Sequence, residues 1–328
     1  MPSPITFENL HRRFGDRWIL TGLDLEVKPG QIHALLGRNG SGKTTALRIL
    51  LGFMEPHAGR STIFGVDSGK LGPRERSRIG YVSEDHRLYP TMRVGDVLAF
   101  EAATRARFDR DLARRAVERC GLVDKLWVAR LSRGQRAQLA LIVAVASMPE
   151  VMVLDDPALG LDVVMRRELL DVMIDLLGDR GISVLFSSHI LTDVERMADR
   201  ITILHDGRRI VDARLDDLKR RVQKRHWRPA EGSAAPPDLP GVLRAERRDG
   251  GYHLTLLDLD PAGEAKLAAG GARLTAPLPL SLEDLFLDLT RGETRRLLAG
   301  AGGTTAAGDD SRSQAGETTE AAHVGTAS

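Results

Sequence analysis

The order of apolar and polar side chains predicts β-strands at the start of the chain. Residues 5–10 and 23–27 alternate apolar and polar side chains, as half-buried strands do. Residues 31–36 form a short apolar run of strand length, and residues 45–53 then carry leucine and isoleucine at helical spacing. The pattern therefore predicts strands that lead into a strand, a loop and a helix.

Farther along, helical and strand-like segments follow one another. Residues 94–146 have apolar side chains at helical spacing among many arginines and alanines. Residues 151–154 and 182–186 are continuous apolar runs, typical of strands buried on both faces of a parallel sheet, and residues 166–177 between them have helical spacing. This alternation predicts a doubly wound α/β core with a parallel sheet.

The last hundred residues read as a separate small unit. Residues 219–228 hold six basic and no acidic side chains, and proline and alanine follow. We interpret residues 221–240 as an exposed basic, proline-rich linker; a patch for phospholipid head groups is the alternative. Two alternating runs around the turn signal Asp249, Gly250 and Gly251 indicate that residues 241–292 form an α+β accessory domain. Residues 293–328 have almost no large apolar side chains and are expected to be disordered.

Composition narrows the class of protein. Among 328 residues, 42% are hydrophobic and 28% charged, which is an ordinary globular balance. The 47 basic residues are offset by 45 acidic ones, so no nucleic-acid partner is expected. The single cysteine, Cys120, allows no internal disulfide and favours a cytoplasmic location. No segment reaches the roughly 18 apolar residues of a membrane span, and no signal peptide is evident.

The loop at residues 37–44 fits the phosphate-binding pattern G-x-x-x-x-G-K-[ST] at every fixed position. Its backbone N–H groups and those at the start of the following helix can converge on phosphate oxygens. Lys43 would add a positive charge at the β and γ phosphates, and the Thr44 hydroxyl would be a ligand of Mg²⁺. The competing interpretation is a plain glycine-rich turn, which the strand and helix on either side disfavour.

Polar groups follow two of the predicted strands. Asp155 and Asp156 end one apolar run, and His189 follows the next. Ligands of such sheets bind beyond the carboxyl ends of the strands, where these side chains are expected. Phe14, upstream of the loop, could stack on an adenine base or belong to the core. Residues 132–135 have the capping-box pattern of a helix start.

Together these motifs resemble the nucleotide-binding subunit of ABC transporters. Five motifs of that family occur in this chain in the family's order. They are the phosphate loop, the signature at residues 131–135, the paired acidic residues, the turn at residues 158–162 and the histidine at position 189. The resemblance covers residues 5–218. It implies a P-loop NTPase core in residues 1–220, with an N-terminal antiparallel β subdomain and a helical subdomain inserted at about residues 86–148.

The same resemblance implies ATP and Mg²⁺ as cofactors. The side chains implied to hold the nucleotide on this subunit are Phe14, Gly37, Asn39, Gly40, Ser41, Gly42, Lys43, Thr44 and Thr45. Those implied to serve a second ATP-binding subunit, paired head to tail, are Ser132, Gly134, Gln135 and Asp162. Thr44, Asp155 and Glu84 are implied as metal ligands, and Asp156, Glu84 and His189 as the residues of hydrolysis.

Three positions depart from the family pattern. Asp156 stands where the family usually has glutamate, and its side chain is shorter by roughly 1.5 Å of reach. A general base must approach its water closely, so we expect slow hydrolysis and a faster Asp156→Glu variant. Glu84 stands in place of the usual glutamine, and Arg133 in place of a glycine; both are found in exporter subunits.

The expected function is an ATPase on the cytoplasmic face of the cell membrane that powers export through a separate integral membrane permease. The helix around residues 281–286 resembles the accessory segment of exporter subunits. A second hypothesis is a slow nucleotide-gated regulatory module, in which ATP binding is the switch. A third, a soluble relative in translation or DNA repair, is disfavoured because such proteins usually carry two cassettes or long coiled-coil insertions.

Overall fold

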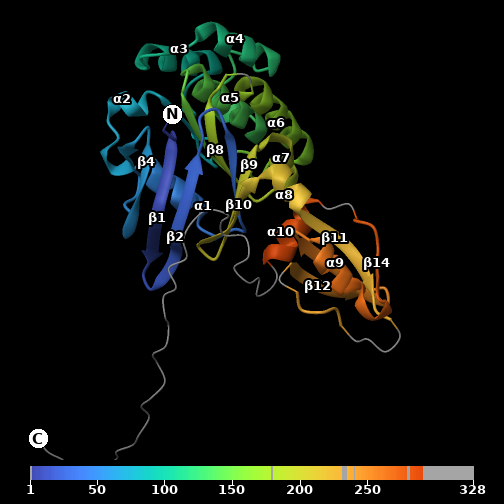
Figure 1. Cartoon of the computed structure of the whole chain (residues 1–328). Coiled ribbons are helices and arrows are strands. Elements are labelled where there is room, and N and C mark those ends of the chain that lie inside the picture. Colours follow the sequence, from blue (N-terminus) through green and yellow to red (C-terminus); the bar gives the residue numbers. More distant parts are fainter. Residues whose placement is uncertain (1, 179, 231–234, 240, 279–280, 291–328) are drawn as a thin grey trace, which may run out of the picture.

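A computed structural model describes residues 2–178, 180–230, 235–239, 241–278 and 281–290. Its strands form three sheets (Figure 1). Two of these sheets, with the helices packed on them, form one large α/β body that contains two hydrophobic cores. The third sheet belongs to a smaller C-terminal unit with a core of its own. The predicted tail at residues 293–328 lies outside the described residues.

The N-terminal sheet is antiparallel, in the order β2-β1-β4-β5. Its strands are β1 (Ile5–Phe14), β2 (Arg17–Val27), β4 (Ala58–Ile63) and β5 (Val66–Asp67). Ile5 pairs with Val27 on one side and Ile63 on the other, and all three are buried. The predicted antiparallel subdomain is confirmed, and β1 runs four residues beyond the predicted end.

The central sheet has the order β10-β9-β3-β8-β7-β6. Its strands are β3 (Ile32–Leu36), β6 (Ile79–Val82), β7 (Val151–Asp155), β8 (Ser183–Ser188), β9 (Arg200–His205) and β10 (Arg208–Arg214). All pairings are parallel except that of the edge strand β10 with β9. Leu35 and Val153 pack in the core shared with the N-terminal sheet, whereas Leu36 and Leu154 face the opposite core. The predicted doubly wound fold is confirmed.

Helices cover both faces of the central sheet (Figure 1). Helix α1 (Lys43–Leu50) packs in the core shared with the N-terminal sheet, and α5 (Arg133–Ala146), α6 (Val163–Leu177) and α7 (Leu191–Met197) pack in the core on the opposite face. Helices α3 (Val94–Thr104) and α4 (Arg110–Arg119) pack against α5, and the short α2 (Pro73–Arg76) precedes β6. The segment 94–146, expected to be helical almost throughout, is interrupted between α4 and α5, where Trp127 forms a β-bridge with Arg93. The C-terminal end of α5 is buried beside the central sheet, and the carbonyl of its last residue, Ala146, accepts from the N–H of Asp109 at the start of α4, at 2.7 Å.

The interpretation of residues 221–240 as a linker is wrong for its first third. After α8 (Leu215–Arg221), Val222–Arg228 is strand β11 of the third sheet, in the order β12-β13-β11-β14. The basic side chains of β11 have acidic partners: Arg225 lies 2.6 Å from Glu264 and Lys224 lies 3.6 Å from Asp288. Trp227 is buried and donates from Nε1 to the carbonyl of Leu267, at 2.7 Å.

The remaining elements of the C-terminal unit have the α+β composition expected for residues 241–292. β12 (Val242–Arg248) and β13 (Gly251–Leu257) form the expected hairpin, followed by α9 (Pro261–Ala268), β14 (Arg273–Leu274) and α10 (Leu282–Thr290). Helix α10 packs against α7, and its Leu282, Leu285 and Leu289 belong to the core of the large body. The unit is therefore packed against the large α/β body rather than joined to it only by a linker. No helix in the described ranges is long and apolar enough to cross a membrane.

Candidate active site

The phosphate loop joins β3 to α1 as predicted. Gly42 has a φ of 106°, which favours glycine, and a Cβ there would lie 2.9 Å from the carbonyl oxygen of Ile19. The Lys43 ammonium folds back over the loop and donates to the carbonyl of Gly37 at 2.7 Å. The hydroxyl of Ser41 is buried and has no hydrogen-bond partner among the described residues. The loop thus presents a cation and a spare donor, which suits an anionic ligand.

Lys43 lies among three carboxylates. Burial lowers the pKa of its ammonium, and Asp156, Asp155 and Glu84 act in the opposite direction and raise it. A cation held in this way, beside acidic groups and free backbone N–H groups, is placed to neutralise a phosphate. The arrangement is the one the motif predicts for the β and γ phosphates.

Thr44 and Asp155 come together at the carboxyl end of β7. Thr44 Oγ1 donates to Asp155 Oδ1 at 3.0 Å, and Ser187 Oγ donates to the same oxygen at 2.9 Å. A hydroxyl and a carboxylate so close form a set of hard oxygen donors, which Mg²⁺ prefers. The oxygens of Thr44 and Asp155 therefore fit the implied Mg²⁺. Glu84 and Thr44 line one cavity.

Asp156 is held next to Asp155 by two side chains. Its N–H donates to Ser187 Oγ at 2.9 Å, and its Oδ2 lies 2.6 Å from Nδ1 of His189. Its backbone is left-handed, with a φ of 45°. Burial raises the pKa of the Asp156 carboxyl, while the hydrogen bond and charge of His189 lower it. Its second oxygen, Oδ1, is buried and has no hydrogen-bond partner among the described residues.

A cavity of about 320 Å³ gathers most of the predicted nucleotide-site residues. Its lining includes Phe14, Asn39, Gly40, Gly42, Lys43, Thr44, Thr45, Glu84 and Asp156. Phe14 is 47% exposed, so the core interpretation of this residue is wrong. The guanidinium of Arg12 lies 5.0 Å from the centre of the Phe14 ring and leaves the ring within reach of the cavity.

The four residues implied to serve a second subunit lie outside this cavity. Ser132, Gly134 and Gln135 start α5, and Asp162 caps α6 by accepting from the N–H of Met165 at 2.9 Å. The capping box is present: Ser132 Oγ accepts from the N–H of Gln135 at 3.1 Å, and Gln135 Oε1 accepts from the N–H of Ser132 at 3.0 Å. The first turn of α5 contains no acidic residue. The start of α5 thus presents a positive helix end away from its own phosphate loop.

The start of α5 packs closely on the chain around Gly160 and α6. A Cβ at Gly134 would lie 2.1 Å from Cε and 3.1 Å from Cβ of Met165, so an added side chain would displace the end of Met165 and crowd its Cβ. A Cβ at Gly160, whose φ is 70°, would lie 2.4 Å from Nη1 of Arg133. The arginine in place of the family's glycine therefore covers the loop that follows Asp156.

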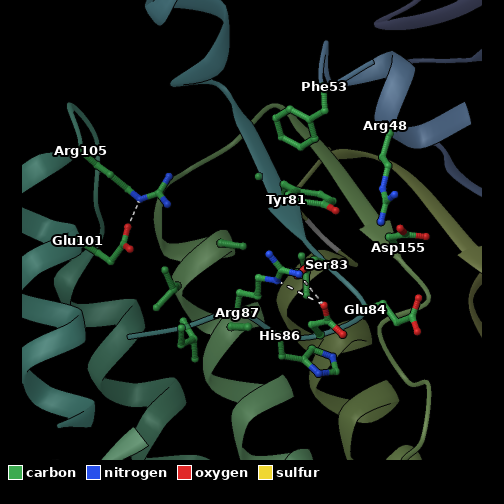
Figure 2. A pocket seen from close by; sticks show the side chains of 17 residues that line it. Arg48, Phe53, Tyr81, Ser83, Glu84, His86, Arg87, Glu101, Arg105 and Asp155 are labelled. Carbon is green, nitrogen blue, oxygen red and sulfur yellow. Dashed lines mark hydrogen bonds and ion pairs between the residues drawn. The ribbon is translucent and has the colours of Figure 1, made fainter. Parts of the chain in front are cut away.

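A second cavity, of about 470 Å³, opens on the other side of Glu84 (Figure 2). We call it the α3 cleft; its lining includes Arg48, Phe53, Tyr81, Ser83, Glu84, His86, Arg87, Glu101, Arg105 and Asp155. Phe53 and Tyr81 meet edge to face with ring centres 5.8 Å apart, and Arg105 pairs with Glu101 of α3. Glu84 and Asp155 thus connect the α3 cleft to the metal site.

His86 is a residue that the sequence analysis missed. It is 1% exposed, has a φ of 48°, and donates from Nε2 to the carbonyl of Pro157 at 2.7 Å. Burial lowers the pKa of the His86 ring and so favours its neutral form. The hydrogen bond to the Pro157 carbonyl acts in the opposite direction and raises that pKa. A single histidine two positions after Glu84 matches no sequence motif. Its role becomes visible only through the hydrogen bond to Pro157, which lies 71 positions farther along the chain.

Comparison with known proteins agrees with this geometry. The family model described as "ABC transporter" matches residues 20–159. An ABC transporter ATP-binding protein of Bacillus subtilis is 34% identical over 68% of this chain and 75% of its own length. The bacitracin transport ATP-binding protein of Bacillus licheniformis is 31% identical over 68% of this chain and 74% of its own length.

Solved structures support the same assignment. One described as the ATP-binding subunit of an ABC transporter has a TM-score of 0.59 and 27% identity, and the match covers 66% of this chain and 92% of the other. A dimeric cassette bound to ADP and Pi shares the fold, with a TM-score of 0.55 and 23% identity. The predictions of a P-loop fold and of an ATPase are therefore confirmed. This chain belongs to the ABC transporter family, as an ATPase subunit.

Proposed function

We propose that this chain binds ATP between two copies or homologous subunits and hydrolyses it to power transport through a separate integral membrane permease. One observation carries the hydrolytic part of the proposal. At the mouth of the phosphate loop, Thr44 and Asp155 meet within 3.0 Å beside the pair formed by Asp156 and His189. A set of metal-binding oxygens and a candidate base thus lie at the same end of the central sheet.

Each group has a distinct part in hydrolysis. The loop N–H groups and Lys43 bind and orient the phosphates, while Thr44, Asp155 and Glu84 would hold Mg²⁺. The metal, when bound, neutralises charge on the phosphate oxygens. Asp156 Oδ1 accepts a proton from the water that attacks the γ-phosphorus, and the bond from that phosphorus to the ADP oxygen breaks. With Nδ1–H as the donor, the hydrogen bond from His189 favours the ionised form of Asp156 and opposes the effect of burial, which raises the pKa of this carboxyl.

The second half of the site is proposed to come from a partner subunit. Ser132, Gly134 and Gln135 do not line the cavity of their own chain. They open a helix of 14 residues whose first turn carries arginine and no acid. A positive helix end of this kind attracts an anion, and the γ-phosphate held by a partner's loop is one that this fold can supply.

The membrane partner is proposed to bind in the α3 cleft. Phe53 is 59% exposed there, and the nearby Tyr89 and Phe100 are also exposed and meet edge to face at 5.2 Å. Exposed aromatic side chains among charges of both signs are typical of a surface that binds another protein. A protein in this cleft would contact Glu84 and thereby sense the metal site.

Export from the cytoplasmic side is the proposed direction of transport. Glu84, Arg133 and the C-terminal unit carry the resemblance to exporter subunits. A protein named for Nod factor export, from Burkholderia orbicola, is 34% identical. One named for aliphatic sulfonate import, from Rhodococcus jostii, is 36% identical, so the direction rests on those features and not on overall identity.

A regulatory module in which ATP binding alone is the switch is the second candidate function. The short side chain of Asp156 favours it, because a base that fails to reach its water leaves ATP bound for longer.

Two measurements test the proposed function. Steady-state ATPase activity of the chain with its membrane partner should exceed that of a Lys43→Ala control; equal rates would support the regulatory module. Affinity purification of the chain from detergent-solubilised native membranes should recover an integral membrane protein. Recovery of the chain without one would contradict the transport role.

A further inference from the structure

Two segments far apart in the sequence are joined by one buried hydrogen bond. His86 lies at the base of the α3 cleft, two positions after Glu84 (Figure 2). Its Nε2 donates to the carbonyl of Pro157 at 2.7 Å. Pro157 directly follows Asp156 in the chain. The contact therefore runs from the cleft wall to the backbone beside the candidate base.

Several hydrogen bonds fix the chain around Asp156. The Asp156 N–H donates to Ser187 Oγ at 2.9 Å, its carboxylate is bound by His189, and its carbonyl accepts from the N–H of Leu159 at 3.0 Å. The next carbonyl, that of Pro157, is bound by His86. Because proline has no N–H of its own, this carbonyl is the hydrogen-bonding group that its backbone offers. Removal of the His86 bond would leave the Pro157 carbonyl without this partner.

The backbone is left-handed at His86 and at Asp156, the residue before Pro157. His86 has a φ of 48° and Asp156 a φ of 45°, and left-handed backbone costs free energy in residues other than glycine. Such conformations persist where neighbouring contacts fix them. The bond between His86 and Pro157 is one such contact, and it joins one left-handed residue to the immediate neighbour of the other.

We propose that His86 is a positioning residue for ATP hydrolysis: its hydrogen bond to Pro157 holds Asp156 at the place from which its carboxylate reaches the attacking water. Because a carbonyl only accepts, Nε2 of His86 must carry the hydrogen. The contact also links the α3 cleft to Asp156, so a partner that shifts residues 83–86 would shift the base. This last consequence rests on the proposed membrane partner; the positioning role rests on the ATPase alone.

The test compares three variants of the full chain. His86→Gln keeps an N–H donor at nearly the position of Nε2, His86→Leu fills similar space without a donor, and His86→Asn tolerates a positive φ but is too short to reach the carbonyl. For each we would measure the kcat and KM of ATP hydrolysis, nucleotide affinity and the melting temperature. Lys43→Ala gives the background rate.

We expect His86→Leu and His86→Asn to lose about tenfold or more in kcat, with KM and nucleotide affinity within about twofold, because misplacement of the base affects the chemical step. His86→Gln should retain kcat within about threefold. A kcat near wild type in His86→Asn, or equal losses in the Gln and Asn variants at similar melting temperatures, would overturn the proposal. If His86→Leu does not fold, the comparison of Gln with Asn decides. A wild-type rate equal to that of Lys43→Ala would instead count against the ATPase itself.

Discussion

Nδ1 of His189 lies 2.6 Å from Oδ2 of Asp156, so the two residues form a bonded pair at the carboxyl ends of β7 and β8. The bond lowers the pKa of the buried Asp156 carboxyl against the effect of burial. Replacement of His189 by alanine removes this support, raises the pKa of Asp156 and leaves its carboxylate unbound. We expect kcat to fall by about a hundredfold or more with ATP affinity kept, measured by steady-state kinetics and nucleotide titration. Loss of nucleotide binding would contradict the assigned role.

Asp156→Glu tests the reach of the candidate base. The added methylene restores roughly the 1.5 Å by which aspartate falls short, so kcat should rise severalfold. The matched control is Asp155→Glu, in which the same extension at the metal-binding position should lower activity. A rate for Asp156→Glu at or below that of the wild type would show that the left-handed backbone already brings the shorter side chain into place.

Gly134→Ala should separate the starts of α5 and α6. Its new Cβ would meet Met165 at 2.1 Å, whereas a Cβ at Gly95, also the second residue of a helix, has its nearest contact at 3.4 Å. We expect Gly134→Ala to lower ATPase activity about tenfold and Gly95→Ala to keep it, with up to about 1 kcal/mol of added stability. Met165→Ala should restore part of the loss in Gly134→Ala. Equal activity of the two alanine variants would refute the packing argument.

His33 gives a test of stability against pH. It is fully buried, its Nε2 lies 2.8 Å from Thr202 Oγ1, and burial lowers its pKa to about 4. The unfolded chain therefore binds a proton that the folded chain does not, and stability falls as pH decreases from 6.5 to about 4, by about 3 kcal/mol at most. Urea unfolding at pH 7 and pH 4.5 should show a smaller loss for His33→Gln than for the wild type. The exposed His57→Gln is the control, and an equal loss in all three proteins would be the contrary result.

Much of the site was accessible from the sequence because its signals are local. The phosphate loop, the capping box of Ser132 and Gln135, and the acidic end of β7 each lie within a few consecutive residues. Parallel strands buried on both faces have continuous apolar runs, so β7 and β8 could be recognised, and the carboxyl-edge rule brings Asp155 and His189 together.

Contacts between distant segments were not accessible in this way. The basic run in β11 reads as solvated, because the acids that pair with it, Glu264 and Asp288, lie 39 and 64 positions away from Arg225 and Lys224. The bond between His86 and Pro157 spans 71 positions and needs a left-handed histidine that no propensity predicts. The packing of α10 on α7 is likewise a tertiary contact.

In the proposed ATPase the phosphate loop is half of a site that Ser132 of another subunit completes. The most direct test is the mass of the Asp156→Asn variant in solution, with and without Mg²⁺ and ATP. In this variant slowed hydrolysis should leave a dimer with ATP and a monomer without it. Adding Ser132→Arg should leave ATP binding intact and yield a monomer under both conditions. Two results would contradict the composite site. One is a double variant, Asp156→Asn with Ser132→Arg, that still forms a dimer with ATP; the other is an Asp156→Asn protein that stays monomeric at saturating ATP.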